Sequence, residues 1–126
     1  MSALRVWPTE LRLGKDRRSL TVVFDNGVSH RLEAEYLRVE SPSAEVRGHA
    51  PAERKTVSGC IDVRIVGIEP VGNYAVRISF DDGHSTGLYG WDYLAELGEQ
   101  HDERWQRYLA ELAAKGLSRE TPDLPR

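Results

Sequence analysis

The residues best suited to chemistry in this chain are a histidine and an aspartate beside a tight turn. The stretch FDDGHSTGLYGWDYL, which begins at Phe80, contains both Asp81 and His84. An imidazole can bind a divalent metal, and a nearby carboxylate can orient it. A two-residue turn at Asp82-Gly83, the type that this dipeptide favours, puts Asp81 opposite His84. A zinc or iron site at His84, with Asp81 or His49 as partner, is one interpretation.

A structural role for His84 is the other interpretation. The same turn places His84 on the polar face of the hairpin, together with Arg77, Ser79 and Thr86. There a partly exposed imidazole would pair with Asp81, in a cross-strand contact worth about 0.2–1 kcal/mol. The residue types leave both interpretations open.

No motif of the common catalytic classes occurs in the structural setting that its chemistry needs. The pattern G-x-S-x-G occurs once, as GHSTG at residues 83–87, but in a predicted hairpin and not at the strand-to-helix turn that carries a hydrolase nucleophile. The sequence contains no G-x-G-x-x-G and no P-loop. Cys60 is the single cysteine, which excludes an internal disulfide and a four-thiolate metal site. We therefore predict a protein that is not an enzyme and expect no cofactor.

Composition and charge narrow the class of protein further. The chain has 126 residues, of which 40% are apolar and 29% charged, as in a soluble single domain. The 17 basic and 20 acidic residues give a net charge of -3, without the basic excess of nucleic-acid binders. The stretch MSALRVWPTE does not resemble a secretory signal, and no apolar run approaches the ~20 residues that span a bilayer. We expect a cytoplasmic protein that binds neither nucleic acid nor membrane.

Two similar β-units are expected to position these residues. The stretch FDNGVSHRLEAEYL is a close copy of the one that contains His84. The copies align Leu32 with Leu88 and, after one inserted residue, Tyr36-Leu37 with Tyr93-Leu94. Apolar residues alternate before each turn, which indicates strands with one buried face. We predict an α+β fold of two antiparallel three-stranded units with short helical elements and a C-terminal helix.

The C-terminal third of the chain is predicted to be helical. A strand is expected at Asp62–Ile68, and apolar residues at helical spacing predict a helix over Asp102–Lys115. Gly116 is a good residue to end that helix. We expect a single domain over residues 1–116 and a flexible tail over 117–126.

A long connector from Ser41 to Gly59 joins the two units. Ser41 is a good N-cap and Pro42 suits the first helical position, so SPSAEV is predicted to form one capped helical turn. His49 and the basic residues around it could bind an anion, although a solvated loop explains them as well.

Three stretches of the chain resemble a known family. They are LRVESPSAEVRGHAP, IEPVGNYAVRISFDDGHSTGLYGWDYL and RWQRYLAEL, and together they cover roughly Leu11 to Gly116. They resemble the gamma-butyrobetaine hydroxylase-like N-terminal domain, in its small free-standing bacterial form. In hydroxylases of carnitine synthesis, this domain precedes an iron- and 2-oxoglutarate-dependent catalytic domain and binds a structural zinc. A related domain is fused to Mrp-type ATPases linked to iron–sulfur cluster assembly.

The resemblance also implies where the zinc ligands would fall. In the family, three cysteines spaced C-x-C-x-x-C and one histidine hold the metal; these positions fall on Ser41, Ser43, Val46 and His84. Serine is a poor zinc ligand and valine is none, so one ligand of four survives. We therefore predict that the zinc site is largely lost. Hydrogen bonds from Ser41, Ser43 or Glu45 to His84 are the predicted replacement.

Two functions follow from these observations. The first is a non-catalytic module that binds a protein partner, with Tyr89, Trp91 and Tyr93 as candidate contact residues and Trp7 interpreted as a packing residue. An exposed hairpin edge could also support a homodimer. The alternative is a metal-binding module for zinc or iron, accessory to iron–sulfur or oxygenase systems.

Overall fold

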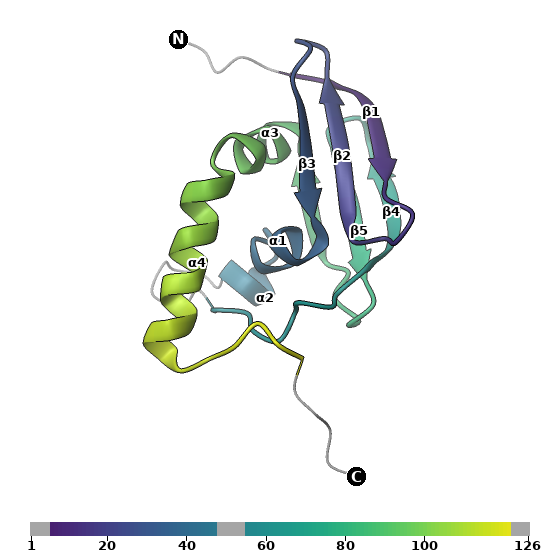
Figure 1. The fold of residues 1–126 in the computed structure, drawn as a ribbon. Coiled ribbons are helices and arrows are strands. Elements are labelled where there is room, and N and C mark those ends of the chain that lie inside the picture. The colour runs from purple at the N-terminus through teal and green to yellow at the C-terminus, as the bar shows by residue number, and fades with distance from the viewer. Residues whose placement is uncertain (1–5, 48–54, 122–126) are drawn as a thin grey trace.

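The computed structural model describes residues 6–47 and 55–121, except the side chains of Glu45 and Arg47 (Figure 1). The elements follow in the order β1 (Pro8–Leu13), β2 (Ser19–Phe24), β3 (Ser29–Glu33), α1 (Ala34–Val39), α2 (Ala44–Arg47), β4 (Ile65–Val71), β5 (Ala75–Phe80), β6 (Gly87–Gly90), α3 (Trp91–Glu99) and α4 (His101–Lys115). The predicted α+β class with two three-stranded units and a C-terminal helix is confirmed. We call β1 to α1 the first unit and β4 to α3 the second unit.

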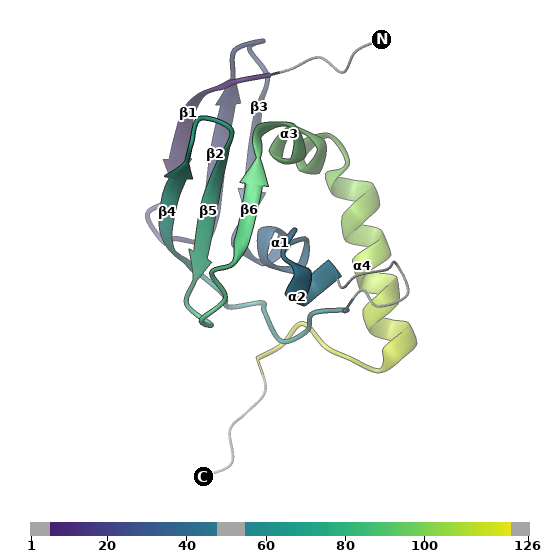
Figure 2. The same cartoon turned by 180° about the vertical axis from the view of Figure 1, so that it is seen from behind.

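The two antiparallel sheets have the strand orders β1-β2-β3 and β4-β5-β6. They lie face to face, with β3 and β6 on the side of the helices and β1 and β4 at the opposite edge (Figures 1 and 2). The core lies between the sheets and under α1 and α3. Its fully buried members include Leu20, Val22, Leu32, Leu37, Ile65, Ile78, Tyr89, Leu94 and Leu97. In the described residues, no helix combines the length and the apolar character needed to cross a membrane.

The turns of the two hairpins contain three residues, and the predicted two-residue turns are wrong. The amide of Phe80 donates to the carbonyl of His84 over 2.9 Å, and Gly83 has φ +92°. Asp82 is not among the described residues with positive φ, which a two-residue type I′ turn would require at both central positions. The carboxylate of Asp82 accepts the amide of His84 over 3.1 Å, which stabilises the longer turn.

The turn length changes the face on which His84 lies. Because His84 is paired with Phe80, it shares the inner face of the sheet with that ring, and the two ring centroids are 6.3 Å apart. The predicted position on the polar face, with a partly exposed imidazole, is therefore wrong: His84 is 8% exposed. The Asp81 carboxylate accepts a hydrogen bond from the Arg64 amide over 3.0 Å.

The inserted residue of the second copy lies in its hairpin, before β6. Leu32 pairs with Leu20 in the first unit, and Tyr89 pairs with Val76 in the second. Tyr89 is therefore the structural counterpart of Leu32. The sequence alignment matches Leu32 with Leu88 instead, and Leu88 is 39% exposed. One extra residue is enough to exchange the buried and exposed positions of a strand.

Two tyrosines make reciprocal hydrogen bonds across the contact between the units. The hydroxyl of Tyr36 donates to the carbonyl of Leu97 over 2.7 Å, and the hydroxyl of Tyr93 donates to the carbonyl of Glu40 over 2.6 Å. Tyr36 and Tyr93 are counterparts in the repeat, and each donates to the residue four positions after the other. The contact between the units is thus approximately two-fold symmetric.

Helix α4 packs against both units and begins one residue earlier than predicted. The guanidinium of Arg104 contacts the buried carboxylate of Glu40 at 2.7 Å, pairs with Glu96 and lies 5.6 Å from the ring centroid of Tyr93. Gly116 ends the helix in the left-handed conformation, with φ +67°, as predicted. These contacts fix α4 against α1 and α3.

The first residues after α4 dock on the connector and on α1. The amide of Gly59 donates to the carbonyl of Ser118 over 2.9 Å, and the guanidinium of Arg119 makes two hydrogen bonds with the buried carboxylate of Glu35. Residues 117–121 therefore have definite contacts where a flexible tail was expected. The domain boundary at residue 116 stays a prediction.

We expect Gly98→Ala to destabilise the protein. A methyl group at Gly98 in α3 would lie 2.2 Å from Cγ of His30 in β3, so the imidazole or the helix would have to move. Overpacking of this kind costs about 1–3 kcal/mol. Gly67→Ala is the control, since its methyl group would lie 3.8 Å from the Ser79 side chain, an ordinary contact. Equal free energies of unfolding for the two variants, measured by urea denaturation, would contradict the prediction.

The imidazole of His101 connects α4 to β3. Its Nε2 lies 2.8 Å from the Glu33 carboxylate, and its Nδ1 lies 3.1 Å from that of Asp102. Burial lowers the pKa of His101, but hydrogen bonds to Asp102 and Glu33 outweigh this effect, and the net pKa is raised. The folded protein therefore binds this proton more tightly than the unfolded chain does.

We expect His101→Gln to cost more stability at about pH 5.5 than at about pH 8.5. A raised folded-state pKa gives a contribution that is complete below the unfolded value of about 6.5 and is lost as the pH rises through the folded value. The measurement is the difference in free energy of unfolding between variant and wild type at each pH. A difference that grows with rising pH would refute the assignment.

Candidate functional site

The polar cluster around His84 is the first candidate site. Nε2 of His84 lies 2.9 Å from Oγ of Ser41 and 3.3 Å from Oγ of Ser43. All three residues are buried, and Ser41 is only 1% exposed. The prediction that hydroxyls of the connector contact His84 is confirmed for both serines, whereas the Glu45 side chain lies outside the described atoms.

The close approach of the connector to the second hairpin depends on a glycine. A Cβ atom on Gly87 would lie 2.6 Å from Oγ of Ser41, so a larger residue there would displace the hydroxyl that contacts His84. Helix α2 begins at Ala44, and the predicted N-cap at Ser41 is therefore two residues too early. Oγ of Ser41 instead accepts the amide of Ser43 over 3.3 Å, which turns the chain locally.

The donor atoms of this cluster do not fit the zinc site of the family. They are one imidazole and two neutral hydroxyls, and the fourth position, Val46, buries an apolar side chain. Structural zinc takes thiolate and imidazole ligands. Over residues 6–47 and 55–121, no group of three or more His, Cys, Asp and Glu side chains is arranged to hold a metal. His49 lies outside the described residues.

Cys60 is buried beside this region, and its chemistry is that of a packed side chain. Burial raises the pKa of the Cys60 thiol to about 11, and its S–H donates to the carbonyl of Ser58 over 3.4 Å. A thiol with such a pKa is protonated near neutral pH, and the thiolate is the reactive form.

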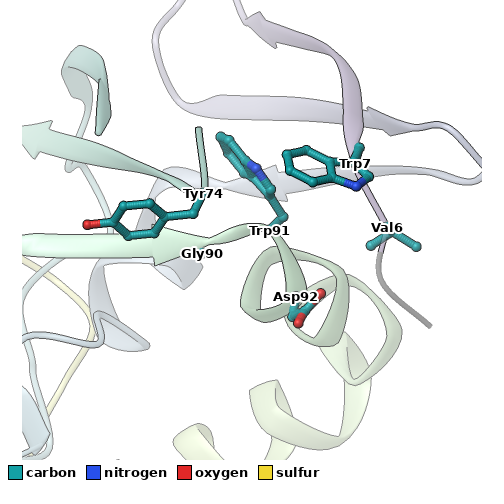
Figure 3. A pocket seen from close by; sticks show the side chains of 6 residues that line it. All are labelled: Val6, Trp7, Tyr74, Gly90, Trp91 and Asp92. Atoms are coloured by element: carbon teal, nitrogen blue, oxygen red, sulfur yellow. The ribbon is translucent and has the colours of Figure 1, made fainter. Parts of the chain in front are cut away.

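An aromatic pocket on the surface is the second candidate site. It has a volume of about 170 Å³ and is lined by Val6, Trp7, Tyr74, Gly90, Trp91 and Asp92 (Figure 3). Its walls come from the segment before β1, the β4–β5 turn and the start of α3. Trp7 is 46% exposed and Tyr74 is 58% exposed, so the prediction of Trp7 as a packing residue is wrong, and Tyr74 is a site residue that the sequence analysis does not name.

Only some of the contact residues predicted from the sequence lie at the surface. Trp91 lines the pocket. Tyr89 is fully buried, and its hydroxyl donates to the carbonyl of Leu37 over 2.5 Å, so its prediction as a surface contact is wrong. Tyr93 is partly buried, and its hydroxyl donates to the backbone carbonyl of Glu40. A large aromatic residue in a turn, such as Tyr74, was the available signal for the pocket.

Two facing three-stranded sheets, joined by a connector that is fastened to the second hairpin, define a small α+β module. The chain belongs to the gamma-butyrobetaine hydroxylase-like N-terminal family, whose model matches residues 11–95. The expectation from the sequence is thereby confirmed, although the matched region ends before α4. No protein in a search of curated proteins matches the chain.

Solved structures of similar proteins share the fold. One NMR solution structure is 46% identical, with 94% of each chain covered and a TM-score of 0.80. Another is 43% identical and covers 100% of this chain and 96% of its own, with a TM-score of 0.81. A crystal structure of a protein of unknown function from Acidithiobacillus ferrooxidans is 38% identical, with 72% of this chain and 91% of that chain covered and a TM-score of 0.61.

We expect Ser41→Ala to lower the free energy of unfolding by about 1–3 kcal/mol, because it removes the shorter contact of a buried imidazole. Ser85→Ala is the matched control, since Ser85 is next to His84 in sequence but exposed. Chemical denaturation of both variants measures the difference. If Ser41→Ala were as stable as Ser85→Ala, the cluster would not hold the connector.

Proposed function

We propose that this protein is a non-catalytic module that binds a protein partner. The proposal rests on the burial of the polar cluster. His84 contacts Ser41 and Ser43 in the interior, and these contacts join the connector to the second unit. Groups that are buried and hydrogen-bonded in this way support the fold. A partner would therefore bind to the surface of the protein and not to this cluster.

The surface also offers residue types that are common in protein interfaces. Trp7 and Tyr74 are large and exposed, and they lie at one pocket together with Trp91. Tryptophan and tyrosine are enriched among the residues that dominate binding energies between proteins. An exposed aromatic group rimmed by polar residues is typical of an interaction site.

The alternative function is a module that binds zinc or iron through His84. It would need ligands in addition to the two serine hydroxyls, and His49 is the candidate named from the sequence. Neutral hydroxyls are weak ligands for zinc, and the carboxylate of Asp81 already accepts the amide of Arg64. The proposal of a protein-binding module therefore has the better support.

Metal content separates the two functions. We expect protein purified without an affinity tag to contain less than stoichiometric zinc and iron by elemental analysis. The triple variant Ser41→Cys, Ser43→Cys, Val46→Cys restores the C-x-C-x-x-C spacing beside His84, and we expect it to bind one zinc ion per chain. Adding His84→Ala to the triple variant is the control for that site. A stoichiometric metal in the wild type that His84→Ala removes would favour the alternative.

A reconstituted complex tests the partner directly. The full chain would be used to capture proteins from cells, and each captured protein would then be purified and titrated by calorimetry. A saturable complex of fixed stoichiometry supports the proposal, whereas captured proteins that fail to bind in purified form contradict it.

A further inference from the structure

The walls of the aromatic pocket are held in place before any ligand binds. The amide of Trp7 donates to the Asp25 carboxylate over 3.3 Å, and its carbonyl accepts the Asp25 amide over 2.8 Å. The indole N–H of Trp91 donates to the carbonyl of Asn73 over 2.9 Å, and the backbone amide of Trp91 donates to the backbone carbonyl of Tyr74 over 3.3 Å. A preorganised wall loses little entropy when a ligand is bound.

The pocket offers ring faces and one negative charge. Because the N–H of Trp91 is already used, this indole presents its π face, which attracts cations. Asp92 is exposed and forms no ion pair with any residue of the described chain. The N-terminus of α3 carries about half a positive charge, which the full charge of Asp92 exceeds. A cation is therefore the favoured charge at this site.

We propose that the pocket binds an arginine side chain of the protein partner, an inference that rests on the proposed function. A guanidinium is planar and weakly hydrated, so it can stack on the indoles of Trp7 and Trp91 while it pairs with the carboxylate of Asp92. A volume of about 170 Å³ suits the end of one side chain. The phenol of Tyr74 points away from the two indoles and is free to contact the rest of the partner (Figure 3).

Short peptides test the pocket itself. The probe is acetyl-Gly-Arg-Gly-amide, and the control is the same peptide with citrulline, which has the shape of arginine without its charge. The indole N–H resonances of the ¹⁵N-labelled chain report binding. We expect the arginine peptide to shift the signals of Trp7 and Trp91 but not that of Trp105, which packs between Tyr36 and Arg119. Equal shifts with citrulline, or no shift at Trp7 and Trp91, would overturn the proposal.

Two substitutions test the cation–π contact and the ion pair separately. We expect Trp7→Leu and Asp92→Asn each to weaken the arginine peptide about two- to fivefold, as the loss of an exposed cation–π contact or ion pair would. Asp102→Asn, at the exposed start of α4, is the matched control and should leave the affinity unchanged. Identical affinities for Asp92→Asn and wild type would refute the charge pairing.

The complex with a purified partner separates this inference from the proposed function. If the complex forms and Trp7→Leu weakens it, both are supported. If the complex forms and neither Trp7→Leu nor Asp92→Asn changes its affinity, the arginine pocket is refuted and the binding module remains. If no purified partner binds the wild type, the proposed function itself fails.

Discussion

A short buried helix cannot satisfy its own backbone, and α1 imposes this constraint on the whole protein. It has only six residues, and the last four carbonyls of any helix lack partners within it. The amides of Glu40 and Ser41 donate to the carbonyls of Tyr36 and Arg38. The carbonyl of Leu37 accepts the hydroxyl of Tyr89, and the carbonyl of Glu40, just after the helix, accepts that of Tyr93. Tyr89 and Tyr93 belong to the second unit. The helix of the first unit is therefore complete only when the second unit is packed against it, which explains why the two units form one core.

Side-chain hydrogen bonds fasten the connector at both ends. At its start, His84 contacts Ser41 and Ser43, and these are three of the positions that the family resemblance assigns to zinc ligands. Hydrogen bonds contribute about 0.5–1.5 kcal/mol each, whereas structural zinc contributes about 10–16 kcal/mol in small zinc domains. At its far end, Tyr108 donates to the carbonyl of Val57 and Lys115 donates to Thr56. These two hydrogen bonds come from α4, beyond the region that the family model matches, and they fix the far end of the connector.

The candidate pocket depends on the same union of the two units. Trp7 precedes the first strand of the first unit, while Tyr74 and Trp91 belong to the second. The pocket therefore exists only in the assembled fold, at a place where backbone hydrogen bonds fix the aromatic walls. The protein thus uses His84, Ser41 and Ser43 inside to join its parts, and it exposes Trp7 and Tyr74 at the surface.

Local patterns were sufficient to predict the strands to within a few residues, the repeat and the end of α4 at Gly116, whereas the contact of Ser41 with His84 was predicted from the family resemblance. Alternation of apolar residues and a glycine in the left-handed conformation are properties of a few neighbouring residues, and a sequence displays them directly. The burial of His84, the match of Leu32 with Tyr89 and the exposure of Trp7 were decided by the tertiary structure. Each depends on strand register or on segments distant in the chain, and a shift of one residue reverses which face of a strand is buried.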